Sequence, residues 1–286
     1  MEPAARRSGC EGNEPMSVQT SYLTQAAQAV AGMLHDSGEA DIVARVASAT
    51  TPQGVIAIRG TTDKWARAIA TGDTPVLDTD SIATVIATAT TPVIATGAAL
   101  DGVVGVTELW PPRNIVLTLN NHADWDPSTI LVRGKDWSGA PCEEAFEVPN
   151  AGNVTLTGNT AFSFVDEVYI PAQTGTNGTL DVGTGVKIGP IDRKVIGIVR
   201  YDSTREGGAA FVQYEDMSII QGGRVWVNAE AAVTEGDPVY VRFVVAGDEV
   251  YGAMRAAPDS TDCGLLHRAR WASTTTGAAL ALVELL

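Results

Sequence analysis

The chain has 286 residues, of which 45% are hydrophobic, so it can bury the core of one large domain or two ordinary ones. Asp and Glu total 34 against 19 Lys and Arg, and the formal charge of −15 excludes charge attraction to nucleic acid or an anionic membrane. Cys10, Cys142 and Cys263 are too far apart for a zinc motif or a disulfide framework, which predicts free thiols in a reducing compartment. No run of about 20 unbroken apolar residues predicts a membrane helix.

The amino-terminal region divides at Met16. Residues 1–15 lack an apolar run, so they do not form a signal peptide, and we expect a disordered extension. Residues 16–52 hold few large apolar side chains and cannot form a core alone, which predicts an arm that lies on another surface. Within this arm, the apolar residues between Ala26 and Leu34 predict one face of a short helix that ends near Asp36.

Residues 53–110 are rich in β-branched side chains. The stretch QGVIAIRG (residues 53–60) alternates as a strand does, and the triplet Ile-Ala-Thr recurs between residues 69 and 96. Four apolar residues from Ile82 to Ala89 also fit the period of a helix. Branching at Cβ favours the pleated surface of a sheet, however, so we predict strands. The tripeptide Trp-Pro-Pro at 110–112 then breaks any regular element.

Residues 112–188 change to short strands separated by Gly, Asn and Pro at intervals of about ten residues, which is typical of a β-sandwich. From residue 189 apolar alternation returns and continues to the terminal ALALVELL. We therefore predict a mostly β protein with a β-barrel or sandwich-like core, residues 53–111 and 189–286. This core is split by an inserted sandwich at residues 112–188. Three domains in a row are the alternative.

No group of residues predicts catalysis. His122, Asp124 and Asp126 in NNHADWDPST offer ligands for a divalent metal, but their spacing matches no EF-hand and is typical of an Asx-rich turn. Cys263 and His267 would face each other only on a helix, and the sequence around them is strand-like. We therefore expect no catalytic residue, no cofactor, no metal site and no enzymatic activity.

Three segments carry a family resemblance. They are SYLTQAAQAVAGMLHDSGEADIVARVASAT (21–50), VTEGDPVYVRF (233–243), with Gly236, Asp237, Val239 and Tyr240, and TTTGAALALVEL (274–285). In turn, they resemble the amino-terminal arm, an internal strand and the closing strand of the structural cement (capsid decoration) proteins of tailed bacteriophages. The region between RNIVLTLNN (113–121) and LDVGTG (180–185) looks like an immunoglobulin-like insert of the kind common in phage virion proteins.

The resemblance implies a virion structural protein that binds the outer surface of the capsid and cements neighbouring major capsid subunits, with the sandwich projecting outward. It implies the major capsid protein and other copies of the chain, as a homotrimer, as partners, and synthesis in the cytoplasm of the bacterial host. In this interpretation Tyr22, Leu23, Met33 and Leu34 of the arm anchor to the capsid.

A second function stays open at this point. The inserted sandwich carries Trp125 and Trp137, and tryptophan rings can stack on sugars. The insert could therefore make weak surface or glycan contacts, and the alternative to a cement protein is an adhesion or glycan-binding module of a virion or cell surface.

Overall fold

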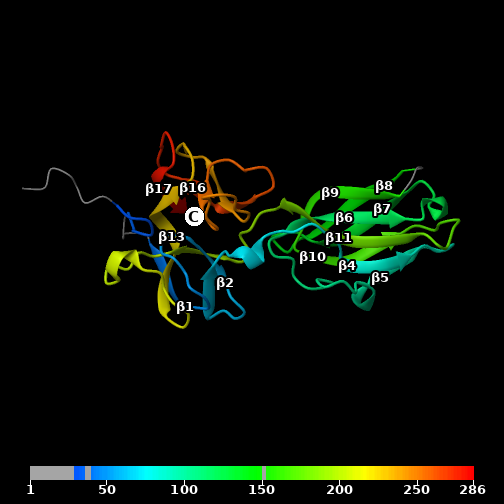
Figure 1. Cartoon of the computed structure of the whole chain (residues 1–286), viewed down its shortest axis with the longest axis horizontal. Coiled ribbons are helices and arrows are strands. Elements are labelled where there is room, and N and C mark those ends of the chain that lie inside the picture. Colours follow the sequence, from blue (N-terminus) through cyan, green and yellow to red (C-terminus); the bar gives the residue numbers. More distant parts are fainter. Residues whose placement is uncertain (1–28, 36–39, 150–152) are drawn as a thin grey trace, which may run out of the picture.

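The computed structural model of the chain describes residues 29–35, 40–149 and 153–286, and these residues form two β-rich bodies (Figure 1). The chain builds the first strands of the core, leaves it for the sandwich after β3, and returns to the core after β11. The predicted mostly β fold, with a barrel-like core split by a sandwich, is confirmed. None of the helices in the described ranges is long and apolar enough to cross a membrane.

The sandwich has two four-stranded sheets. The first has the order β4 (Asp78–Ala87), β11 (Thr179–Ile188), β6 (Arg113–Asn120), β9 (Val154–Phe162). The second has the order β5 (Val93–Thr96), β10 (Phe164–Ile170), β7 (Ser128–Lys135), β8 (Pro141–Val148). Alternate residues of both sheets point inward and bury one apolar core, which includes Ile82, Leu117, Ile130, Phe162 and Val182.

The strands of the sandwich pair as a nested series. β4 pairs with β11, β5 with β10, β6 with β9 and β7 with β8, all antiparallel, as if one long hairpin were rolled up. Eight strands in two such sheets make a jelly roll, whereas an immunoglobulin domain divides seven or nine strands differently. The predicted immunoglobulin-like topology is therefore not found.

The nested pairing also moves the boundary of the insert. β4 and β5 lie within residues 53–111, the range assigned to the core from the sequence, yet both pair with strands of the sandwich. The reason is that the strand entering a jelly roll must lie beside the strand leaving it, and Asp78 is indeed the register partner of Thr184. The sandwich strands thus begin at Asp78 and end at Ile188.

The core consists of two rings of strands that share one long strand, β13 (Asp216–Ala229). The first ring contains β1 (Asp41–Ala47), β3 (Trp65–Ala68), β2 (Ile56–Arg59) and β12 (Val195–Val199). The second contains β15 (Met254–Arg255), β14 (Pro238–Arg242), β16 (Cys263–Trp271) and β17 (Ala279–Leu285). β1 pairs with the first half of β13 and β17 with the second half, so segments from both sides of the insert complete the core.

The segment at residues 29–35 is part of this core. Leu34 forms a β-bridge with Val225, and the backbone N–H of Gly32 donates to the carbonyl of Trp226 at 2.7 Å. Gly32 has φ +85°, and a Cβ there would come within 3 Å of backbone atoms of Val199 and Gly54. This turn prevents a helix at residues 29–35, so the predicted helix is not found there. Its first residues, 26–28, and the expected extension at residues 1–15 lie outside the described residues.

The two bodies touch through side chains beside their connections. The ring of Trp110 packs edge to face against the ring of Phe243, a core residue, with centroids 5.9 Å apart. Trp137, in the turn between β7 and β8, stacks on His267 of β16 at 4.6 Å, and Asp192 accepts a hydrogen bond from the backbone N–H of His267. These contacts set the sandwich against one end of the second ring.

Candidate interaction surfaces

The residues that the sequence assigned to capsid anchoring differ in their surroundings. Tyr22 and Leu23 lie outside the described residues. Met33 is 42% exposed, whereas Leu34 is half-buried against the apolar core beside Val225. Of the two described members, Met33 is therefore exposed on the surface, and Leu34 holds its own segment onto β13.

A second exposed apolar site lies at the end of the first ring, where β3 begins. We call Trp65, Val212 and Tyr214 the aromatic tip. Tyr214 is 70% exposed and Val212 is 54% exposed, and the Trp65 and Tyr214 rings meet edge to face with centroids 5.5 Å apart. The apolar alternation after residue 189 did not predict this tip. Its one signal in the sequence is the stretch VQYED (212–216), in which an aromatic residue stands beside Gln and acidic residues.

The loop that carries the tip is held at both ends. Phe211 forms a two-way backbone bridge with Thr51, and the N–H of Tyr214 donates to the carbonyl of Ala47 at 2.8 Å. The guanidinium of Arg205 lies 4.1 Å from the Phe211 ring centroid and pairs with Glu215 at 2.8 Å. These contacts hold Tyr214 at φ +75°, a left-handed conformation that a bulky side chain rarely adopts.

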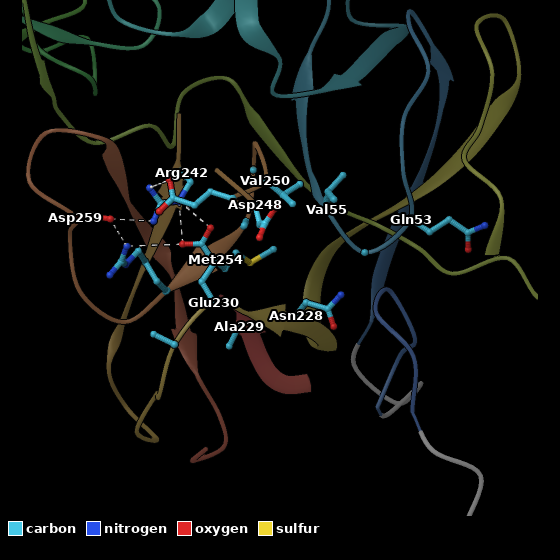
Figure 2. A pocket seen from close by; sticks show the side chains of 16 residues that line it. Gln53, Val55, Asn228, Ala229, Glu230, Arg242, Asp248, Val250, Met254 and Asp259 are labelled. Carbon is cyan, nitrogen blue, oxygen red and sulfur yellow. Dashed lines mark hydrogen bonds and ion pairs between the residues drawn. The ribbon is translucent and has the colours of Figure 1, made fainter. Parts of the chain in front are cut away.

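A pocket of about 590 Å³ opens between the two rings (Figure 2). Its wall contains Arg242, which is 2% exposed and pairs with Glu230 at 2.7 Å and with Glu249 and Asp259 at 3.0 Å each. Hydrogen bonds with Glu230 raise the pKa of Arg242 above its ordinary value, and those from Arg242 and Arg255 lower the pKa of Asp259. The guanidinium is thus already occupied by carboxylates, and this cluster ties loops together.

In the turn NNHADWDPST, the side chain of Asp126 binds a segment that is distant in sequence. Asp126 accepts hydrogen bonds from the backbone N–H and the hydroxyl of Thr174, at 2.7 and 3.0 Å. Trp125 is buried and donates its indole N–H to the carbonyl of Asn120. The described residues hold no group of three His, Cys, Asp or Glu side chains placed to bind a metal, and the side chain of His122 lies outside what the structure describes.

Both tryptophans that suggested glycan binding pack against other residues of the chain. Trp125 belongs to the sandwich core, and Trp137 is stacked on His267. His267 in turn lies with Nδ1 3.1 Å from a carboxylate oxygen of Asp192, so it connects the sandwich to the core. Cys263 is buried on the same strand, β16, where it lies in register with Arg242 of β14.

Comparison with known protein families identifies the carboxy-terminal part. Residues 151–286 match the family described as structural cement protein (E217 gp24/Pam3 gp6). This region is similar to the phage structural cement proteins. No curated protein matches the chain. The resemblance inferred from the sequence is thus confirmed over these residues, and similarity to structural cement proteins implies a structural protein of the virion capsid, in association with its subunits.

The matched region covers both bodies. It holds β9–β11 of the sandwich and β12–β17 of the core, and so includes Tyr214 and the Arg242 cluster but not Trp65. The cement-like motif at Gly236 and Asp237 forms a turn before β14, in which Gly236 has φ +91° and Asp237 accepts a hydrogen bond from the N–H of Thr234. This turn sends Val239 into the core of the second ring.

Proposed function

We propose that this chain binds the outer surface of a phage head and cements neighbouring major capsid subunits through its core, while the sandwich projects outward. The family match supports a cement role. The division into two bodies, joined at one end of the second ring, gives the chain one part that can attach and one part that can project (Figure 1).

The distribution of charge supports an orientation in which the sandwich points away from the capsid. Thirteen acidic and four basic side chains lie between Asp78 and Ile188, so the sandwich holds most of the net negative charge of the chain. Such a surface favours solvent, and copies that project side by side would repel each other and stay apart. The edge strand β8 adds to this effect because Glu143 and Glu147 are exposed along it, and charges on an edge discourage pairing with another sheet.

The core offers the surfaces suited to attachment. Met33 and the aromatic tip are exposed there, and the preceding residues Tyr22 and Leu23 could extend the contact from one capsid subunit to the next. Many small contacts on a repeating surface gain strength through effective concentration. A homotrimer would multiply them again, and it belongs to this proposal.

Synthesis in the host cytoplasm also belongs to the proposal. Among the described residues Cys142 lies in the sandwich and Cys263 in the core, and both are free thiols. Burial, followed by nearby carboxylates, raises the pKa of Cys142 to about 11, so the thiol stays protonated and slow to oxidise. Unpaired cysteines of this kind are typical of proteins that fold in a reducing compartment.

Co-sedimentation tests the proposal. The purified chain is mixed with phage heads that lack it, the heads are pelleted, and the bound chain is quantified; light scattering of the free chain gives its oligomeric state. We expect saturable binding, and cryo-electron microscopy of the decorated heads should place the core on the shell and the sandwich outside. A chain that stays in the supernatant at all concentrations contradicts the proposed function.

A further inference from the structure

We propose that the aromatic tip, Trp65, Val212 and Tyr214, is the anchor that this chain inserts into an apolar depression rimmed by carboxylates on a capsid subunit. The inference rests on the proposed function and names the residues that would carry it. Tyr and Trp dominate the binding energy of protein interfaces because one ring buries a large apolar area and loses little conformational freedom.

The tip is rigid before it meets a partner. The backbone of Tyr214 is held at φ +75° by its hydrogen bond to Ala47, and Gln213 donates its side-chain amide to the carbonyl of Ser48 at 3.0 Å. A strained conformation persists only where the surroundings impose it, and it is most often found at functional sites. A ring that is already fixed loses little entropy on binding, so more of its burial contributes to affinity.

The charges around the tip define the chemistry of the partner. In the described part of the chain Lys64, next to Trp65, has no carboxylate at ion-pair distance, and Arg45 reaches only the carbonyl of Ala44. Of the neighbouring carboxylates, Asp63 pairs with Arg59 and Glu215 with Arg205, whereas Asp216 is exposed and has no ion pair among the described residues. The unpaired cations Lys64 and Arg45 outnumber this one carboxylate, so the tip combines apolar rings with net positive charge in a chain of net charge −15.

Other exposed apolar residues lack this combination. Val103 is 95% exposed and Val76 and Leu77 are exposed at the entrance to the sandwich, but no aromatic residue occurs between Val76 and Val103. The one guanidinium at this entrance, that of Arg113, is half-buried and donates to the carbonyl of Val76 at 3.3 Å. Isolated exposed valines are ordinary on protein surfaces. A two-fold contact between the tips of two copies would bring Lys64 close to its own counterpart, which disfavours a second copy as the occupant.

The first variants test the contribution of the Tyr214 ring without disturbing the unusual backbone conformation of that residue. Tyr214→Asn removes the ring, and because Asn tolerates φ above zero, the loop should keep its shape and the melting temperature should not fall. Val212→Asp places a charge in the contact, and Val103→Asp makes the same change on the sandwich as a matched control. In co-sedimentation with heads that lack the chain, we expect at least about tenfold weaker binding for Tyr214→Asn and Val212→Asp, and unchanged binding for Val103→Asp.

Charge is tested separately. Lys64→Glu should weaken binding and flatten its dependence on salt, whereas Lys187→Glu in the sandwich should change neither. If Tyr214→Asn, Val212→Asp and Lys64→Glu all bind heads as the unmodified chain does, the tip is not the anchor and the inference is overturned, while the proposed function stands. If the unmodified chain itself does not bind heads, both are overturned.

Discussion

Arg242 shows how a single residue shapes the second ring of the core. Its guanidinium is 2% exposed and is satisfied by Glu230 of the segment after β13, by Glu249 of the following loop, and by Asp259 before β16. Three stretches of chain distant in sequence are therefore tied to one side chain of β14. A buried charge of this kind stabilises a fold only while its partners are in place.

Replacement of Arg242 by Met should be severe. Met keeps much of the volume but leaves the carboxylates of Glu230, Glu249 and Asp259 crowded around an apolar chain, and loss of one partner of a buried ion pair costs about 3–5 kcal/mol. Urea unfolding monitored by tryptophan fluorescence measures this loss of unfolding free energy. Arg133→Met is the matched control, because Arg133 is 45% exposed and its pairs with Glu143 and Glu167 should be worth about 1 kcal/mol or less. Equal losses in the two variants would show that burial of Arg242 does not decide its contribution.

The same cluster predicts a loss of stability in acid. Hydrogen bonds from Arg242 and then Arg255 lower the pKa of Asp259 in the folded chain. A carboxyl with a lowered folded pKa adds stability above its unfolded pKa, and this contribution disappears as the pH falls through the folded pKa. The unfolding free energy should therefore fall as the pH drops below about 4. Asp259→Asn should be less stable than the unmodified chain at pH 7 and flatter between pH 5 and 3; parallel curves would assign the acid limb to other carboxylates.

At the scale of elements, the turn at Gly32 connects the amino-terminal segment to the core. Its carbonyl accepts a hydrogen bond from Tyr201 and its N–H donates to Trp226, so this one residue joins the end of β12 to β13. Space for a side chain is absent there, since a Cβ would approach the carbonyl oxygen of Val199 at 2.7 Å. The segment that presents Met33 thus depends on a glycine.

Gly32→Ala should release this segment. The substitution combines a disfavoured φ of +85° with a clash against backbone, and we expect a loss of about 1–3 kcal/mol, together with faster amide hydrogen exchange at residues 32–35. Gly277→Ala is the control, because among the described residues nothing lies within 4 Å of the position its Cβ would take. Unchanged exchange at residues 32–35 in Gly32→Ala would mean that the contacts to β13 hold the segment without the turn.

Local patterns predicted the strands well and their partners poorly. RNIVLTLN coincides with β6, and ALALVELL contains β17, because alternation along a strand is a property of adjacent residues. The assignment of residues 78–96 to the core was wrong in its pairing, since β4 and β5 find their partners β11 and β10 at the other end of the domain. The residues of β4 alone do not indicate that this strand pairs with β11.

The candidate sites were likewise predictable only where they depend on residues adjacent in sequence. The turn around Asp126 could be recognised from its own residues, but Thr174, the partner of the Asp126 side chain, could not. The aromatic tip brings Trp65 beside Tyr214, and the Arg242 cluster gathers Glu230, Glu249 and Asp259, only after both rings have closed. Gly222 and Gly223 show a related limit, because a pair of glycines that suggests a turn lies within the continuous strand β13, where the chain passes from one ring to the other.

At the scale of the whole molecule, the jelly roll explains how one domain can sit inside another. Its entering and leaving strands are paired, with Asp78 beside Thr184, so the core meets the insert as two neighbouring ends. The core itself needs β1–β3 from before the insert and β12–β17 from after it, and β1 and β17 share β13. The sandwich is therefore separable in space although it interrupts the sequence of the core.

Two deletions distinguish this architecture from a boundary at Pro112. Replacement of residues 78–184 by a short glycine linker removes the jelly roll except for the last four residues of β11. It should leave a folded core that lacks the contact between Trp110 and Phe243. Deletion of residues 113–188 instead keeps β4 and β5 without any partner and exposes buried Ile82 and Ile86, so this variant should aggregate. Size-exclusion chromatography and circular dichroism measure both outcomes. A monodisperse, β-rich product from the second deletion would show that β4 and β5 can pair with the core.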